Sequence, residues 1–350
     1  MADQGDSHSD YTDEQMKLLT ALLASLIPLS SQAALNIYWI DVEGGASTLV
    51  VTDAGQSVLM DSGYAGLSNR DVDRVEHVVK HEAGLGHIDY YLTSHFHGDH
   101  VGGLTGLAER VEIRSFIDHG ESVELGSAGG KAIWEAYLAV AGDKRRVVKP
   151  GDTLALEGVE FVFVASNGET LQQALPGGGG TNALCAAYEP KPDDQGENGR
   201  SLGYFLKSGA FEFVNLGDLF WSFQHRLACP VSVIGEVDIY QAAHHATRDD
   251  VLPQQLWPMR PTVAVANNGP VKGGGAQAIE YLKQSPGLEE LWQLHKVLAN
   301  DAEHNAAEEL TANLGATDGC QGHWIHARVD GGSYTVINSR NGFSKTYAVK

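Results

Sequence analysis

Three histidines and an aspartate lie within six residues of one stretch of this 350-residue chain. The pattern is H-x-H-x-D-H, formed by His95, His97, Asp99 and His100, and it directly follows an apolar run that ends at Leu92. Imidazole and carboxylate groups are the ligands of hydrolytic metals such as zinc. The first two histidines are spaced to project toward one metal, and the Asp-His pair comes from the next turn and can reach a second. The spacing therefore predicts a metal-binding loop at the end of a buried strand.

The elements before this loop follow from the periodicity of apolar residues. Runs at 36–42, 47–52 and 57–60 predict three strands separated by glycine turns. Valines spaced three and four residues apart predict an amphipathic helix over 69–81. A further strand at 88–93 then leads into the metal loop. This order of strands and helix predicts an α/β fold.

The H-x-H-x-D-H pattern resembles the signature of the metallo-β-lactamase fold superfamily. The resemblance implies a four-layer αββα sandwich, in which two mixed β-sheets are flanked by helices. It also implies that Asp218, which follows the predicted strand 211–216 in a Gly-Asp pair, bridges two metals. By the same resemblance His245 is the last metal ligand, and Asp61 supports the metal loop from behind.

A His-His pair, His244 and His245, ends the predicted strand 237–243. Such a pair resembles the branch of the superfamily that contains DNA-uptake competence proteins and bacterial phosphocholine esterases. The resemblance implies that His245 is the ligand and that His244 faces the substrate, with the reverse assignment left open. His119, at the end of the predicted strand 111–117, is a further candidate, as a third ligand of the first metal, as a residue that faces the site or as a hydrogen-bonded loop histidine.

The resemblance implies a hydrolase that uses two divalent metal ions, with zinc expected and manganese or iron as alternatives. Two such ions lower the pKa of a shared water toward neutrality. Asp99 and His244 are the candidate catalytic residues. The His-His branch favours phosphoesters of the diester type, and carbonyl esters such as lactones or β-lactams are the alternative. The sequence has no glycine-rich phosphate loop followed by Lys-Ser/Thr, so nucleoside triphosphate chemistry is not indicated.

Later segments complete the expected domain. Residues 176–200 predict a long surface loop of the kind that shapes access to a site. A loop containing Lys272 follows the predicted strand 262–266 and is either a plain turn or part of the site. The remaining expectations are helices at 277–283, 288–298 and 306–313, and a hairpin of 323–329 and 333–338 on the edge of the second sheet.

Residues 1–34 are expected to be an N-terminal extension that ends in a signal peptide at 16–34, and 35–350 to be the hydrolase domain. This expectation rests on Lys17, the apolar run at 18–29 and the small residues that follow it. An amphipathic helix is the alternative. The protein is then exported, to the periplasm or the medium, with no membrane attachment after cleavage. Two of the three cysteines could form a disulfide, although the sequence does not say which, and buried free thiols are the alternative. None lies in a C-x-x-C pair, so the sequence does not indicate a thiolate metal site.

The chain is strongly acidic, with a net charge of −21. An acidic surface repels polyanions, which argues against long nucleic acids as partners and leaves a small-molecule substrate. The natural substrate and the oligomeric state stay open.

Overall fold

The computed structural model describes residues 1–2, 34–247, 250–316 and 320–350. The expected signal peptide at 16–34 lies outside these residues except for Ala34, which begins the first strand. Among the described residues, no helix is both long and apolar enough to cross a membrane.

The first sheet combines the N-terminal half of the chain with its C-terminal hairpin. Its middle strands β3 to β6 run parallel, and the strands on the other side of β3 pair antiparallel. In spatial order the sheet's strands among the described residues are β17 (Ser344–Ala348), β16 (Ser333–Asn338), β15 (Ile325–Asp330), β1 (Ala34–Trp39), β2 (Thr48–Val51), β3 (Ser57–Met60), β4 (His87–Leu92), β5 (Glu112–Asp118) and β6 (Arg145–Val147).

The second sheet is built from the middle of the chain. Strands β10 to β14 are parallel neighbours, and β9 and β7 add to them antiparallel. In spatial order the described strands are β14 (Thr311–Asn313), β13 (Glu290–His295), β12 (Val263–Ala266), β11 (Ile239–Gln241), β10 (Phe211–Asn215), β9 (Gly203–Ser208), β7 (Glu160–Ser166) and β8 (Glu169–Thr170).

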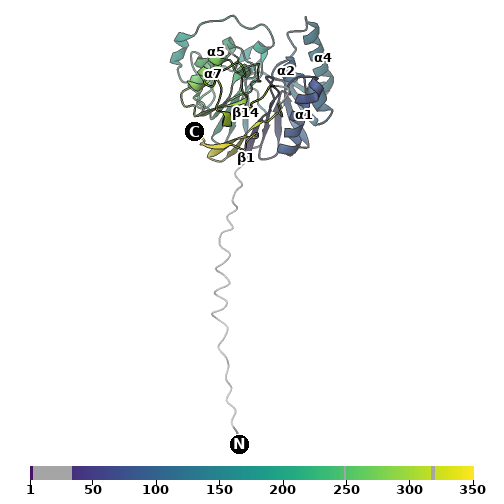
Figure 1. Cartoon of the computed structure of the whole chain (residues 1–350), viewed down its shortest axis with the longest axis vertical. Coiled ribbons are helices and arrows are strands. Elements are labelled where there is room, and N and C mark those ends of the chain that lie inside the picture. The colour runs from purple at the N-terminus through teal and green to yellow at the C-terminus, as the bar shows by residue number, and fades with distance from the viewer. Residues whose placement is uncertain (3–33, 248–249, 317–319) are drawn as a thin grey trace. The chain divides into compact units, whose positions relative to one another are not determined.

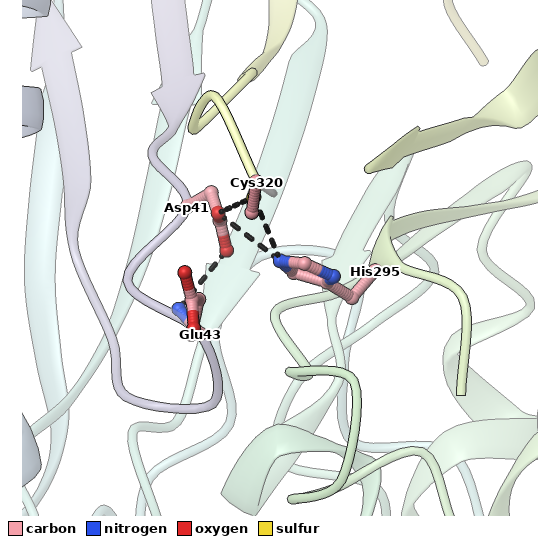
Figure 2. Close-up of side chains that lie close together, drawn as sticks. All are labelled: Asp41, Glu43, His295 and Cys320. Carbon is pink, nitrogen blue, oxygen red and sulfur yellow. Dashed lines mark hydrogen bonds and ion pairs between the residues drawn. The ribbon is translucent and has the colours of Figure 1, made fainter. Parts of the chain in front are cut away.

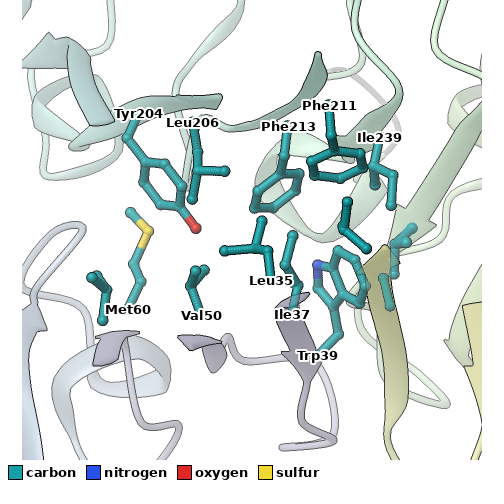
Figure 3. Packing of buried hydrophobic residues seen from close by; sticks show 14 of the residues in the cluster. Leu35, Ile37, Trp39, Val50, Met60, Tyr204, Leu206, Phe211, Phe213 and Ile239 are labelled. Carbon is teal, nitrogen blue, oxygen red and sulfur yellow. The ribbon is translucent and has the colours of Figure 1, made fainter. Parts of the chain in front are cut away.

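The main core lies between the two sheets and follows from the alternation of side chains along each strand. Leu35, Ile37 and Trp39 of β1 meet Phe211 and Phe213 of β10 across this interface (Figure 3). The alternate residues of the same strands face outward and pack under helices. Burial on both faces explains why most residues of these strands are apolar.

Helices cover both outer faces, as Figure 1 shows for α1 and α4 on one side and α5 and α7 on the other. The first sheet carries α1 (Arg70–His77), α2 (Gly98–Val101), α3 (Leu104–Ala108) and α4 (Ala128–Ala141), and the second carries α5 (Trp221–Ala228), α6 (Pro253–Met259) and α7 (Ala276–Lys283). The helix expected over 69–81 is α1 followed by a π-helical turn, Val78–Glu82. The predicted four-layer αββα sandwich is confirmed.

Three predictions for the C-terminal third are wrong. The helix expected at 288–298 is strand β13, and the one at 306–313 is a short 3₁₀ turn (Glu308–Leu310) followed by β14. The apolar residues of β13 fit a helical spacing as well as an alternating one, and its burial between β12 and β14 selects the strand. The C-terminal hairpin of β15 and β16 does not lie on the edge of the second sheet as expected. It pairs with β1 of the first sheet, on the side of β1 that β2 leaves free.

The long loop at 176–200 is confirmed as a surface excursion with short 3₁₀ turns, Ala183–Ala187 and Asn198–Arg200. A disulfide joins Cys185 of this loop to Cys229, which follows α5. Cys320 is the remaining cysteine and has a free thiol.

Candidate metal centre

The candidate ligands gather where parallel strands of both sheets end. The H-x-H-x-D-H loop follows β4, Asp218 follows β10, and the His-His pair follows β11. The carboxyl ends of parallel strands lie at one edge of a sheet, which is where α/β folds place ligand sites. The two sheets therefore bring residues 95–100 together with residues far along the chain.

His95 and His97 face each other with a separation of 3.0 Å between Nε2 of the first and Nδ1 of the second. The other ring nitrogen of each is already bonded: Nδ1 of His95 lies 3.0 Å from Oγ of Ser94, and Nε2 of His97 lies 3.2 Å from a carboxylate oxygen of Glu124. Such bonds fix which nitrogen carries the proton. Two lone pairs then point at one another, and a cation between them would relieve their repulsion.

A second group contains Asp99, His100, Asp218 and His245, whose ligand atoms all lie within 4.8 Å of one another. Nε2 of His100 lies 3.1 Å from Oδ2 of Asp218 and 3.2 Å from Oδ2 of Asp99. Nε2 of His245 lies 3.2 Å and 3.3 Å from the same two oxygens. Asp218 also lies 3.9 Å from Nε2 of His95, so its carboxylate stands between the two groups.

Asp61 secures the loop from behind. Its carboxylate accepts hydrogen bonds from the backbone nitrogen of Ser94 at 2.8 Å, from the hydroxyl of Ser94 at 2.6 Å and from Nδ1 of His100 at 2.8 Å. The last bond leaves Nε2 of His100 free to face the cluster, as metal-binding histidines require. The serine hydroxyl, having donated to Asp61, can accept from His95.

The electrostatics of this cluster suit a cation. Burial by itself would raise the pKa of Asp218, but the imidazoles of His100, His245 and His244 hold that pKa well below its usual range. Burial by itself would lower the pKa of His100, but Asp218, Asp99 and Asp61 raise it well above its usual range. The carboxylates therefore keep a positive charge at this point, and a metal ion would take the place of the proton. The donor set, made of nitrogen and oxygen atoms, fits zinc, manganese or iron.

His244 stands at the rim of the cluster. Its Nδ1 lies 2.6 Å from Oδ2 of Asp250, and its Nε2 lies 3.5 Å from Oδ2 of Asp218. Its side chain is 17% exposed, whereas that of His245 is fully buried among the other ligand residues. The positive φ angles of both residues, 47° and 54°, turn the two rings out of the line of β11.

His119 is buried one layer behind the ligands. Its Nε2 lies 3.0 Å from Oε2 of Glu197, and its ring packs edge-on against Phe96. The structure thus places His119 beside the peptide between His95 and His97, and its described contacts are with these two neighbours.

Glu197, which sequence reasoning missed, is fully buried and comes from the long loop. It accepts hydrogen bonds from the backbone nitrogens of Phe96 and Val123, from the hydroxyl of Ser122 and from His119, at 2.6 to 3.0 Å. A single glutamate in a loop rich in polar residues carries no sequence signal for this role. The loop also places Asn198 within 3.4 Å of Nε2 of His244.

Lys272 reaches the site from the loop after β12. Its ammonium group forms an ion pair with Asp99 and lies 3.4 Å from the hydroxyl of Tyr64. Its side chain is 37% exposed, so the charge borders solvent. Of the two interpretations of this loop, the structure favours the one in which the lysine is part of the site.

Comparison with known proteins agrees with the fold. Residues 40–183 match the model of the Metallo-beta-lactamase superfamily. Members of this superfamily are typically hydrolytic metalloenzymes that bind divalent metal ions, usually two. The two mixed sheets flanked by helices are consistent with the metallo-β-lactamase fold, a fold of the metal-dependent hydrolase type, and the chain carries a His/Asp cluster that could hold a metal ion. The match ends before Asp218 and His245, whose placement in the site rests on the geometry above.

Several solved structures resemble the chain at low identity. The metallo-beta-lactamase fold protein YhfI from Bacillus subtilis is 10% identical, with 84% of this chain and 99% of that chain covered and a TM-score of 0.44. A motif mutant of a metallo-beta-lactamase from Cronobacter sakazakii is 15% identical, with coverage of 58% and 75% and a TM-score of 0.38. Zinc-bound PqqB from Methylobacterium extorquens is 14% identical, with coverage of 59% and 71% and a TM-score of 0.35. Curated protein sequences give no match.

Proposed function

We propose that this protein is a hydrolase that uses two divalent metal ions to cleave phosphoesters. The observation that carries the proposal is the convergence of four ring nitrogens and two carboxylates on one edge of the sandwich. For three of the four histidines the second ring nitrogen is already bonded, which leaves the inward nitrogen available as a ligand.

The first ion would be bound by His95 and His97, and the second by Asp99, His100 and His245. Asp218 would lie between them, because its carboxylate approaches residues of both groups. When bound, the two ions would supply a hydroxide nucleophile at neutral pH and positive charge for the developing oxyanion.

The side chains at the rim favour an anionic substrate. Lys272 places an ammonium group beside Asp99 at the border with solvent, where it can contact a non-bridging phosphate oxygen. His244, oriented by Asp250, directs Nε2 toward the cluster and can donate a proton to the leaving oxygen. The His-His pair also supports a place in the branch with the competence proteins and phosphocholine esterases.

The test is hydrolysis of a chromogenic phosphodiester by protein that has been stripped of metal and then loaded with zinc or manganese. We expect turnover that depends on the added metal and a loss of bound metal and of most activity in Asp218→Ala. A protein that binds two metals but hydrolyses no phosphodiester or phosphomonoester would refute the phosphoester proposal. Turnover of lactones or β-lactams under the same conditions would establish the carbonyl-ester alternative.

Export of the protein is a further part of the proposal. The apolar segment within 16–34 supports it, and so does the disulfide between Cys185 and Cys229, because such bonds persist in oxidising compartments. Fusing residues 1–34 to a reporter that is active only after export tests this point directly. A reporter that stays in the cytoplasm would contradict it.

A further inference from the structure

A second group of metal-binding side chains lies outside the proposed hydrolytic site. Asp41, Glu43, His295 and Cys320 offer ligand atoms within 4.8 Å of one another (Figure 2). Asp41 and Glu43 follow β1, His295 ends β13 in the other sheet, and Cys320 lies between β14 and β15. The group therefore joins both sheets and a connecting segment.

Three of these side chains converge on one small volume. Nε2 of His295 lies 3.1 Å from Oδ2 of Asp41, Sγ of Cys320 lies 3.3 Å from the same oxygen, and Sγ and Nε2 are 3.5 Å apart. Tetrahedral zinc, with bonds of about 2.0 to 2.3 Å, separates its ligand atoms by about 3.3 to 3.8 Å. The triangle of donors thus has nearly the dimensions of a zinc site.

The arrangement is not that of a catalytic relay. In a relay the imidazole contacts the carboxylate through one nitrogen and the nucleophile through the other. Here Asp41 and Cys320 both face Nε2 of His295, and Nδ1 has no hydrogen-bond partner among the described residues. A ring that faces two ligand atoms with the same nitrogen can direct a lone pair at an ion placed between them.

The net charge around the group favours a bound cation. Arg74 pairs with Asp41 at 2.9 Å and Glu43 at 3.0 Å, and Arg70 pairs with Glu43 at 2.8 Å and Asp71 at 2.6 Å. With the imidazole of His295 neutral, three buried carboxylates face two guanidinium groups, and one negative charge is left uncompensated. Buried charge is costly without a partner. A divalent ion bound together with the thiolate would bring this sum to zero.

We propose that Asp41, His295 and Cys320 bind a zinc ion, with Glu43 beside it. Binding would release the thiol proton to solvent, and a neutral imidazole with its proton on Nδ1 would present the lone pair of Nε2 to the ion. The donor set includes a thiolate, so this site is chemically distinct from the hydrolytic one, whose predicted ligands are nitrogen and oxygen atoms only.

The ion would stabilise the turn on which the hydrolytic site rests. Asp41 and Glu43 lead directly into Gly45 and Ala46, and the backbone nitrogen of Ala46 donates to the carbonyl of Asp99 at 3.1 Å. A Cβ at position 45 would collide with the same carbonyl oxygen. Because the two backbones pack this closely, a fixed conformation at Asp41 fixes the backbone of the ligand loop as well.

Cobalt substitution of the full-length protein tests the site at Cys320 by an absorption signal that does not depend on catalytic activity. Cobalt bound by a thiolate absorbs in the near ultraviolet by charge transfer, and Cys320 is the only cysteine not in the disulfide. We expect this band on saturation with cobalt and its loss, with one metal equivalent, in Cys320→Ser. Asp218→Ala should retain the band while it loses metal from the hydrolytic site.

Absence of the band in the saturated protein, or unchanged metal content in Cys320→Ser, would overturn the proposal in favour of a purely hydrogen-bonded network. If Cys320→Ser does not fold, the native protein supplies a second readout. Zinc should then slow the reaction of the Cys320 thiol with a thiol reagent, and a chelator should restore it. Equal reactivity with and without zinc would also overturn the proposal.

Discussion

Replacing Glu197 by glutamine should destabilise the protein because no orientation of an amide satisfies the four donors around this side chain. Each carboxylate oxygen accepts two hydrogen bonds, one pair from Phe96 and His119 and the other from Ser122 and Val123. An NH₂ group on the second side lets the serine hydroxyl turn and accept, but it leaves the Val123 N–H unpaired. A buried unpaired donor costs about 1 to 3 kcal/mol.

The lowered pKa of Glu197 gives a second measure of the folding free energy that its hydrogen bonds contribute. Burial would raise this pKa, but the hydrogen bonds from His119, Ser122 and Phe96 lower it from 4.5 to about 2. A shift of this size corresponds to about 3 kcal/mol of folding free energy. Since the folded pKa is depressed, the contribution is complete above pH 4.5 and is lost as the pH falls toward 2.

Urea unfolding of both proteins at pH 7 and pH 3, in the same chelator-containing buffer, measures the effect. Glu197→Gln should be less stable by about 2 to 3 kcal/mol at pH 7, and the difference should shrink at pH 3. Metal affinity should also fall by about 10- to 100-fold, because the peptide between His95 and His97 loses its support. Glu189→Gln, an exposed change in the same loop, is the control and should shift stability by less than about 0.5 kcal/mol. Equal stability of Glu197→Gln and wild type at pH 7 would refute the reasoning.

Three further outcomes follow from the site and the loop. His244→Ala should lower kcat by about 10²- to 10⁴-fold with little change in metal content, as steady-state kinetics and metal analysis would show, and parallel loss of both would make His244 a ligand. Lys272→Met should raise KM for an anionic phosphodiester about tenfold by removing a charged contact, whereas an equal effect on a neutral ester would exclude charge recognition. Replacing Cys185 and Cys229 by alanine should lower the free energy of unfolding by about 2 to 4 kcal/mol, because the disulfide closes a loop across 44 residues, and an unchanged urea midpoint would contradict this.

The metal-binding loop and the order of strands around it could be predicted from the sequence because both are local. The spacing of His95, His97, Asp99 and His100 is set within one turn. The run of apolar residues before this loop predicts the strand that leads into it. Asp218 and His245 could be placed because each follows a strand in the order that the resemblance implies. Strand ends of parallel sheets share an edge, so their position in sequence carries spatial information.

Contacts between residues far apart in sequence were decided by the tertiary structure alone. Glu197 meets Phe96 across 101 residues, Lys272 meets Asp99 across 173, and His295 meets Asp41 across 254. Each of these contacts depends on how the two sheets pack and how the loops fold over them. The periodicity of apolar residues in the sequence does not predict such contacts. For the same reason the sequence predicts a helix at 288–298, whereas pairing between β12 and β14 makes this segment the strand β13. The candidate metal ligands can therefore be predicted from sequence motifs. The residues that hydrogen-bond to the ligand loop or place a charge beside it are identified only when the packing of the sheets and loops is known.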